Sequence, residues 1–265
     1  KPEVTASVIR SFIENKMYAD TQPTKLYYIT PCFRYERPQA GRQRQFHQFG
    51  IEVLGSDGPS VDAEVISLAV QFFNEMGLKN LSVNINSVGC PTCREEYNRK
   101  LKEYLDKKVD VLCETCLERK DKNPMRVIDC KNPHCKENLQ DIPFMIDHLC
   151  EDCKDHFDKL QTYLKEMDIN YVVDKTIVRG LDYYKKTAFE IISNDIGSQS
   201  TVCGGGRYDG LVEMLGGPKG ISGIGFALGA ERLLLTLENN NIEIENPKST
   251  DIYLSLIHIS EPTRH

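Results

Sequence analysis

Eight of the ten cysteines of this chain lie in four close pairs between Cys90 and Cys153. The pairs are Cys90-x2-Cys93, Cys113-x2-Cys116, Cys130-x4-Cys135 and Cys150-x2-Cys153. Two cysteines on a short turn present their sulfurs at tetrahedral angles, and two such pairs close a structural zinc site with no open position for catalysis. Disulfides are the weaker explanation, because the chain does not open with a secretory signal. We therefore expect these cysteines to bind two zinc ions, with reduced, metal-free thiols as the alternative.

The order of the pairs favours zinc sites built from neighbouring pairs. Nineteen residues separate the first pair from the second, and fourteen separate the third from the fourth. This spacing predicts one site from the first and second pairs and another from the third and fourth. An interleaved arrangement, in which the first pair shares zinc with the third, stays open. His134 and His148 lie beside cysteines, and we interpret them as bystanders because eight thiols are already available.

Composition places the chain among ordinary globular proteins. Its 265 residues are 40% hydrophobic and 27% charged, which allows one large domain or two small ones. No apolar run approaches the ~20 residues needed to cross a bilayer, so we expect a cytoplasmic protein without membrane contact. The net charge of -6 argues against nonspecific coating of nucleic acid, which needs clustered Lys and Arg, but it leaves room for a local site.

Apolar spacing predicts a mixed order of helices and strands, and hence an α+β fold. The predicted helices cover residues 4–15, 60–76, 157–167 and 228–238, and the predicted strands cover residues 25–34, 46–54, 81–85, 171–178 and 189–193. Glycines 204–206 are expected to end a further strand in a tight turn, and glycines 220, 223 and 225 to precede the last helix. Such glycines let a backbone approach a ligand closely. Neither stretch contains the Gly-Lys-Ser or Gly-Lys-Thr of a P-loop, which rules out that nucleotide site.

The strand at 46–54 has two chemically different faces. Alternation places His47, Phe49, Ile51 and Val53 on a core face, and Phe46, Gln48, Gly50 and Glu52 on the opposite face. The second face is either the floor of a pocket for a small polar ligand or a solvated face of an edge strand.

Charged residues gather on the same hairpin. They are Arg34, Glu36, Arg42 and Arg44. One planar guanidinium group can bind two phosphate oxygens at once, so this arrangement favours a triphosphate ligand over a neutral one. An ordinary arginine-rich surface is the alternative.

Four ordered stretches resemble the histidyl-tRNA synthetase family of class II aminoacyl-tRNA synthetases. Residues 33–48 (Phe33-Arg34-Tyr35-Glu36-Arg37-Pro38 through Gln48) are similar to motif 2 of that class, and residues 223–233 to motif 3. Residues 178–184 and 202–210 resemble signatures peculiar to the histidine enzymes. The resemblance implies a class II synthetase-like antiparallel sheet flanked by helices, formed by residues 1–89 and 154–250. Residues 90–153 would then be an inserted zinc-binding module.

The resemblance implies that the protein activates L-histidine with ATP to histidyl-adenylate and transfers it to the 3′ end of tRNA(His). A homodimer and Mg²⁺ bridging the phosphate oxygens are expected with this activity. One alternative is a non-aminoacylating paralogue such as the regulatory subunit of ATP phosphoribosyltransferase, against which the retained Arg179, Tyr183 and Tyr184 argue. A nucleic-acid-binding zinc module with the rest as scaffold would leave the motif 2 and motif 3 residues unexplained.

The resemblance to this family implies roles for individual residues of the chain. The resemblance implies that Arg34 and Arg179 are catalytic and face the α-phosphate. The ATP-binding residues would be Arg34, Glu36, Arg42, Phe46 and Arg232. The histidine-binding residues would be Glu3, Thr5, Gln48, Glu52, Arg179, Tyr183, Tyr184 and Tyr208. Of these, Glu52 and Tyr184 suit the two ring nitrogens of the imidazole.

Several neighbouring residues have structural interpretations. Arg179 could instead pair with Asp182 or Glu190, and we expect Arg207 and Asp209 to form a salt bridge or a cap.

Both ends of the chain depart from the family pattern. Motif 1, which builds the family's dimer interface, would lie upstream of Lys1, so we expect an N-terminal truncation. Residues 251–265 are expected to begin a lost C-terminal anticodon-binding domain. The stretch 254–264 resembles a translated sequencing adapter and is excluded from the fold.

Overall fold

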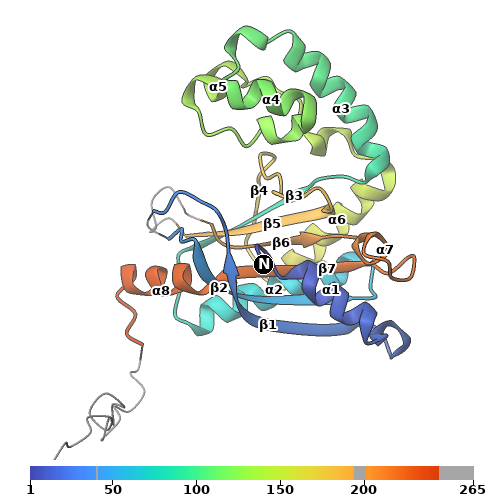
Figure 1. The fold of residues 1–265 in the computed structure, drawn as a ribbon, viewed down its shortest axis with the longest axis vertical. Helices are drawn as coiled ribbons and strands as arrows, with labels where there is room; N and C mark the ends of the chain where they lie inside the picture. Colours follow the sequence, from blue (N-terminus) through green and yellow to red (C-terminus); the bar gives the residue numbers. More distant parts are fainter. Residues whose placement is uncertain (40, 194–200, 245–265) are drawn as a thin grey trace, which may run out of the picture.

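One seven-stranded sheet organises the protein in a computed structural model that describes residues 1–39, 41–193 and 201–244 (Figure 1). The strand order is β1-β2-β7-β6-β5-β3-β4. The strands are β1 (Thr24–Phe33), β2 (Gln45–Leu54), β3 (Leu81–Ser87), β4 (Val172–Val173), β5 (Lys185–Ser193), β6 (Thr201–Arg207) and β7 (Gly223–Gly229). The stretches predicted as a lost domain and an adapter, 251–265, lie outside the described residues.

Helices flank this sheet, as the α+β prediction requires. The α-helices are α1 (Thr5–Glu14), α2 (Pro59–Glu75), α3 (Pro91–Asp106), α4 (Glu114–Lys122), α5 (Pro133–Asn138), α6 (Glu151–Glu166), α7 (Leu211–Met214) and α8 (Ala230–Asn239). Short 3-10 turns cover Met17–Ala19, Val109–Val111, Pro124–Val127 and Met145–His148. In the described part of the chain, no helix has the length and apolar character that a membrane span needs.

Every strand pair is antiparallel except β3 with β4, which is parallel. The strand predicted at 171–178 is only two residues long. Its early end has a local cause: the carboxylate of Asp174 accepts hydrogen bonds from the backbone N–H (2.9 Å) and the hydroxyl (2.6 Å) of Thr176. Such a turn competes with ladder pairing, so the chain leaves the sheet there.

Apolar side chains of α2, α6 and α8 pack against one face of the sheet. Alternation along β2 directs Phe49, Ile51 and Val53 to this face, where the ring of Phe49 stacks on Phe72 of α2 at 5.4 Å between centroids. The opposite face of β2 therefore carries Phe46, Gln48 and Glu52, and no helix of this layer covers them.

The tight turn predicted at residues 204–206 is wrong, whereas glycines 220, 223 and 225 precede the last helix as predicted. Residues 204–206 continue strand β6 and residues 223–229 form strand β7, which pairs with it (Gly206 opposite Gly225). Helix α8 begins only at Ala230. Gly204 and Gly225 are required by the side chains of Arg179 and Glu52, not by a reversal of the chain.

Residues 90–153, which we call the cysteine-rich segment, stand above the sheet in Figure 1. Helix α3 leads away from the end of β3, and α6 returns the chain to the sheet. Buried Tyr97, Leu101 and Leu105 lie one helical turn or so apart on α3 and pack in the same cluster as the buried cysteines. Helix α3 therefore supplies an apolar core for the segment.

Candidate active site and cysteine clusters

A cavity of about 390 Å³ opens on the face of the sheet that α2, α6 and α8 do not cover. It is lined by all of the residues predicted to bind ATP or histidine: Glu3, Thr5, Arg34, Glu36, Arg42, Phe46, Gln48, Glu52, Arg179, Tyr183, Tyr184, Tyr208 and Arg232. These residues come from the start of the chain, the β1–β2 loop, strand β2, the stretch before β5, the residue after β6 and helix α8. The pocket interpretation of the polar face of β2 is thus confirmed over the solvated-edge alternative.

The carboxylate of Glu52 is a buried polar group of the cavity lining. It is only 1% exposed and accepts hydrogen bonds from the hydroxyls of Thr5 (2.7 Å), Tyr208 (2.5 Å) and Tyr28 (3.4 Å). Burial raises the pKa of Glu52 to about 7, although the three hydroxyl donors oppose the shift. A carboxyl group poised near neutrality can accept a hydrogen bond from a polar ligand ring.

Tyr208 and Tyr28 are the tyrosines that donate hydrogen bonds to Glu52. Tyr184 instead packs its ring beneath the guanidinium of Arg179, at 5.2 Å, and against the ring of Tyr183, at 4.7 Å. The stretch at residues 178–184 therefore forms an aromatic wall, and Tyr208 holds the acid at the floor.

Three guanidinium groups from separate parts of the chain face the cavity. Arg34, just after β1, donates to the carbonyl of Pro2 (2.7 Å) and lies 4.9 Å from the ring of Phe46. Arg232 on α8 donates to the carbonyl oxygen of Gly41 at 2.9 and 3.1 Å. Neither has an acidic partner within ion-pair distance among the described residues. Both can therefore offer positive charge to an anion.

Arg179 forms an ion pair with Glu190 of 2.9 Å, so one of the two predicted structural partners is present. The same side chain lines the cavity, and its two interpretations are compatible. Glu36 likewise pairs with Arg42 across the hairpin loop. The Arg42 hydrogen bond lowers the pKa of Glu36, which keeps that carboxylate ionised at the cavity wall.

Close packing around these side chains explains the glycines of β6 and β7. A Cβ atom at Gly204 would lie 2.7 Å from the guanidinium of Arg179, and one at Gly206 would lie 2.7 Å from the carbonyl of Thr187. A Cβ atom at Gly225 would collide with the carboxylate of Glu52. The glycines leave room for the polar groups of the site within a regular strand.

Some lining residues escaped the sequence interpretation. Tyr28 lines the cavity and pairs with Gly50 across the hairpin. The alternation of side chains along β1 could therefore have placed Tyr28 on the same face of the sheet as Gln48 and Glu52. Glu231 and Lys131 also line the cavity. Glu231 accepts a hydrogen bond from the backbone N–H of His47 (2.9 Å), and its carboxylate lies 2.8 Å from the imidazole Nδ1 of His47. His47 is therefore half-exposed beside α8 rather than in the core.

A buried charge cluster supports the floor of the site from behind. Arg207 is fully buried and bonds to Asp62 (Nε to Oδ1, 3.0 Å) and to Asp209 (3.0 Å), as the structural interpretation of Arg207 and Asp209 predicts. His156 Nε2 lies 2.8 Å from the second oxygen of Asp62. Burial alone would raise the pKa of Asp62, but its hydrogen bond with His156 and the charge of Arg207 hold it below its usual value.

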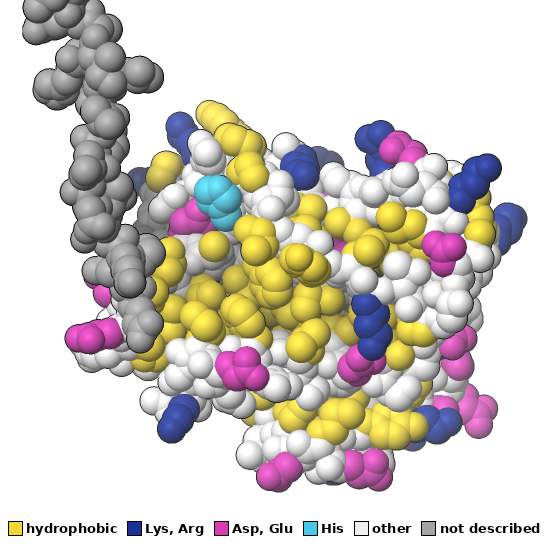
Figure 2. Space-filling view, turned by 90° about the horizontal axis from the view of Figure 1, so that it is seen from below, with side chains coloured by type: hydrophobic (Ala, Val, Ile, Leu, Met, Phe, Trp, Pro, Cys, Tyr) yellow, Lys and Arg dark blue, Asp and Glu magenta, His cyan; other side chains and the backbone are white. Residues whose placement is uncertain are grey.

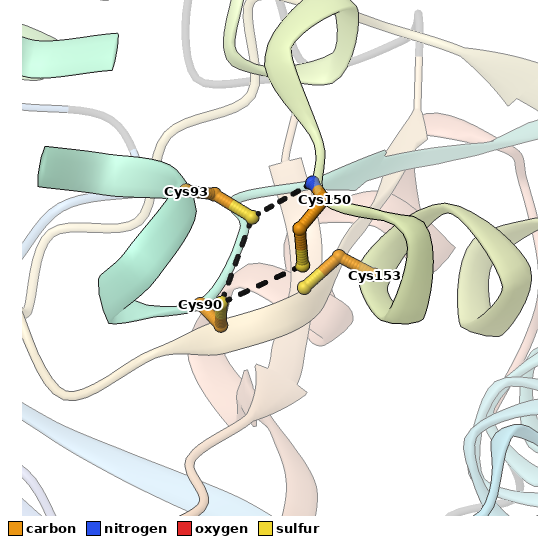
Figure 3. Close-up of side chains that lie close together, drawn as sticks. All are labelled: Cys90, Cys93, Cys150 and Cys153. Atoms are coloured by element: carbon orange, nitrogen blue, oxygen red, sulfur yellow. Dashed lines mark hydrogen bonds between the residues drawn. The ribbon is translucent and has the colours of Figure 1, made fainter. Parts of the chain in front are cut away.

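The cysteine-rich segment contains two groups of four thiols. The inner cluster joins the first and fourth pairs, Cys90, Cys93, Cys150 and Cys153 (Figure 3). The outer cluster joins the second and third pairs, Cys113, Cys116, Cys130 and Cys135. The pairing is nested, so the neighbouring arrangement predicted from the spacing is wrong, and the interleaved alternative is not adopted either. The physical reason is that α6 returns beside the start of α3 and brings the ends of the segment together.

The geometry of both clusters suits a tetrahedral metal ion. In each cluster the four sulfur atoms lie within 4.8 Å of one another, including 3.6 Å for Cys90–Cys93 and 3.9 Å for Cys113–Cys130. Zn–S bonds of about 2.3 Å would hold sulfurs about 3.8 Å apart, whereas a disulfide requires about 2.05 Å. No histidine joins either cluster among the described residues, in agreement with the interpretation of His134 and His148 as bystanders.

Backbone N–H groups point at these sulfurs. The N–H of Cys150 donates to the sulfur of Cys93 at 3.1 Å, and the N–H of Cys113 donates to that of Cys135 at 3.2 Å. Such donors favour the thiolate form that a metal requires.

The sheet with its cavity defines the catalytic fold of a class II aminoacyl-tRNA synthetase. A comparison with protein families matches residues 1–233 to the family described as Histidyl-tRNA synthetase. A crystal structure of apo S. aureus histidyl-tRNA synthetase aligns with a TM-score of 0.75 at 42% identity, covering 92% of this chain and 59% of that one. The chain belongs to the histidyl-tRNA synthetase family.

Curated relatives agree with this assignment. A protein named histidine–tRNA ligase from Clostridioides difficile (strain 630) is 79% identical over 264 residues, which is 100% of this chain and 63% of that protein. Another of the same name from Caldanaerobacter subterraneus subsp. tengcongensis is 56% identical over 257 residues, 97% of this chain and 61% of that protein. The chain spans less than two thirds of the length of these relatives.

Proposed function

We propose that this chain forms the site at which L-histidine is activated by ATP and then transferred to the 3′ end of tRNA(His). The observation that carries the proposal is the meeting of Arg34, Arg179 and Arg232 in one cavity with the buried Glu52. The guanidinium groups suit a polyphosphate, and the acid suits an imidazole. The names of the relatives support the same chemistry.

In the first step, an oxygen of the histidine carboxylate attacks the α-phosphorus of ATP. A bond forms between them, the bond from the α-phosphorus to the bridging oxygen breaks, and pyrophosphate leaves. Negative charge crowds around the phosphorus in the transition state, and fixed cations stabilise it most effectively in a preorganised site. We assign this role to Arg34 and Arg179, whose neighbours Phe46 and Glu190 hold them in place.

Recognition of histidine is assigned to the floor of the cavity. Glu52 accepts a hydrogen bond from one ring nitrogen of the histidine, while Tyr208 and Thr5 orient the carboxylate of Glu52. Tyr183 and Tyr184 form the aromatic wall beside the ring. The α-ammonium group falls to the remaining polar groups of the predicted set, Glu3 and Gln48, which line the same cavity.

ATP is assigned to the side of the cavity between the hairpin loop and α8. Phe46 and Arg232 would cover the two faces of adenine, Glu36 would read its edge, and Arg42 would hold the pyrophosphate end. The carboxylates of this cavity do not form a group of three metal ligands among the described residues. Mg²⁺ would therefore arrive bound to the phosphate oxygens, whose charge it neutralises.

We propose zinc as the metal of both cysteine clusters and residues 90–153 as an inserted domain. Four thiols at tetrahedral spacing match a closed structural zinc site. Residues 1–89 and 154–250 would form the catalytic core. The expected role of zinc is to hold the segment together, since no ligand position stays open for a substrate.

We also propose a cytoplasmic homodimer. Figure 2 shows a broad hydrophobic area on the face seen from below, where β1 and α2 lie. Tyr27 and Ile29 on the outward face of β1 are 76% and 69% exposed, and Leu68 of α2 is 43% exposed. Contiguous apolar surface of this kind is typical of a protein interface.

The decisive experiment is histidine-dependent exchange of labelled pyrophosphate into ATP, with a protein of the relatives' full length that contains this sequence. We expect exchange with L-histidine and none with the other amino acids. A paralogue that only regulates another enzyme would give no exchange while still binding histidine. Charging of a tRNA(His) transcript then tests the second step.

A further inference from the structure

One lining residue of the catalytic cavity comes from the cysteine-rich segment. Lys131 lines the cavity together with Arg34, Arg179 and Arg232, and it directly follows Cys130 of the outer cluster. The other lining residues belong to the catalytic core. The outer cluster is thus covalently adjacent to a cation that faces the proposed substrates.

The backbone on both sides of Lys131 is fixed by local contacts. The sulfur of Cys130 accepts a hydrogen bond from the N–H of Asn132 (3.4 Å). The side chain of Asn132 in turn caps α5 by accepting from the N–H of His134 (3.0 Å). A metal ion bound by Cys130 would therefore fix the turn that presents Lys131.

The cysteine-rich segment also holds the loop that carries Arg179. The guanidinium of Arg126 donates to the carbonyl of Gly180 (3.0 Å), and the amide of Asn123 donates to the carboxylate of Asp182 (2.7 Å). Both residues lie in the sequence between Cys116 and Cys130, within the loop that the outer cluster closes. The cluster is therefore linked to the cavity through two elements, this loop and Lys131.

Lys131 has no acidic partner within ion-pair distance among the described residues, and it is exposed to the cavity and solvent. Its position contrasts with Arg179 and Arg42, whose charges are paired with Glu190 and Glu36. An ammonium group offers three donors and a compact positive charge, which suit a phosphate oxygen.

We propose that Lys131 is a phosphate-binding residue of the active site and that metal in the outer cysteine cluster holds it in position. This inference rests on the proposed function, because it takes the cavity to bind ATP and the 3′ end of tRNA. Both substrates offer phosphate groups: the triphosphate of ATP and the terminal phosphodiesters of the tRNA. The inner cluster ties the two ends of the segment, and Arg94 beside Cys93 donates to the carbonyl oxygens of Asp182 (3.3 Å) and Tyr184, but no residue next to this cluster lines the cavity.

The test compares Lys131→Ala and Lys131→Arg in a protein of the relatives' full length. Lys122→Ala is the matched control, because Lys122 is an exposed lysine of the same segment that does not line the cavity. Losing a hydrogen bond to a charged group weakens binding by about 10-fold or more. If the ligand is ATP, Lys131→Ala raises the Kd for ATP and its KM in pyrophosphate exchange by that factor. If it is tRNA, exchange stays normal and the KM for tRNA rises instead.

The remaining outcomes separate this proposal from its alternatives. Lys131→Arg should restore most of the loss, while zinc content and thermal unfolding stay unchanged in all three variants. Equal ATP affinity and equal tRNA KM in Lys131→Ala and the parent would overturn the role of Lys131. A parent protein without any histidine-dependent exchange would instead overturn the proposed function.

Dependence on metal is tested by combining Lys131→Ala with Cys113→Ser and Cys116→Ser. The variant with both Cys113→Ser and Cys116→Ser should keep one zinc, bound at the inner cluster. It should lose affinity for the same substrate, ATP or tRNA, as Lys131→Ala does. Adding Lys131→Ala to it should then cause no further loss, because residues that act through one element are not additive. A full additional loss of about 10-fold would show that the outer cluster does not position Lys131.

Discussion

The phenolic oxygen of Tyr208 donates a 2.5 Å hydrogen bond to Oε2 of Glu52, and both side chains are almost completely buried. Tyr208 follows directly on Arg207, whose charge is neutralised by Asp62 and Asp209. The hydrogen bond therefore joins the floor of the candidate site to the buried charge cluster behind it. A change at either end should alter both stability and ligand recognition.

Stability should fall as the pH rises through the range in which Glu52 ionises. The pKa of Glu52 is about 7 in the folded protein, against an ordinary value near 4.5. The folded state then holds a proton that the unfolded state releases, so stability declines between these two values. The difference corresponds to about 3 kcal/mol. Chemical denaturation of the parent and of Glu52→Gln at pH 5 and pH 8 measures it, and the variant should show the smaller decline. Parallel pH profiles for the two proteins would contradict this assignment.

Glu52→Gln should also weaken the binding of histidine more than the binding of ATP. A glutamine amide retains the size of the side chain but loses the charge, and such a loss at a buried hydrogen bond costs about 1–3 kcal/mol. Pyrophosphate exchange should therefore show a KM for histidine raised roughly 5- to 150-fold, with little change in the KM for ATP. Equal effects on both substrates would place Glu52 outside the histidine pocket.

Removal of either Arg34 or Arg179 should slow adenylate formation. Loss of one preorganised donor to a developing charge typically costs about 10²–10³-fold in kcat. Single-turnover formation of histidyl-adenylate by Arg34→Ala and Arg179→Ala measures this loss. Arg99→Ala, at an exposed arginine of α3, serves as the control and should behave like the parent. Normal rates in both variants would be incompatible with the assigned roles.

A single methyl group at Gly225 should disrupt the site. The new Cβ atom would collide with the carboxylate of Glu52 and with the backbone carbonyl of Ile51. Overpacking of this kind costs about 1–3 kcal/mol. Gly229→Ala is the matched control in the same strand, because its Cβ atom would lie no closer than 3.7 Å to its nearest neighbour. Thermal unfolding and histidine binding should both distinguish the two variants.

The nested pairing of cysteines can be tested by metal content. Replacing Cys93 and Cys153 with serine removes ligands only from the inner cluster, so purified protein should retain one zinc per chain. Pairing of sequence neighbours would instead place these two cysteines in different sites and leave neither intact. Replacing Cys93 and Cys116 damages both nested clusters and provides the opposite control.

The sequence was most informative where chemistry is local. Alternation on β2 was sufficient to separate Gln48 and Glu52 from the core residues Phe49 and Ile51, and the motif stretches identified the arginines that line the cavity. Spacing along the chain could not reveal which cysteine pairs meet, because this depends on the return of α6 to the start of α3. The ligands of one cluster are brought together by the path of the helices between them.

The sequence also did not predict interactions between residues that lie far apart in the chain. The glycines of β6 and β7 have the composition of a turn, yet the two strands pair, and Gly204 and Gly225 leave room for the side chains of Arg179 and Glu52. Asp62 and His156 bond across 94 residues. Nothing in the local pattern around Asp62 marks it as the partner of His156 and Arg207.

The inner cysteine cluster joins Cys90 and Cys93 at the beginning of the segment to Cys150 and Cys153 at its end. Because the inner cluster holds the two ends of the segment together, the segment is attached to the catalytic core at one place. Its interior could lengthen, shorten or change sequence without moving the two ends of chain that re-enter the sheet. A lineage could therefore remodel this segment wherever Lys131, Arg126 and Asn123 keep their positions at the cavity.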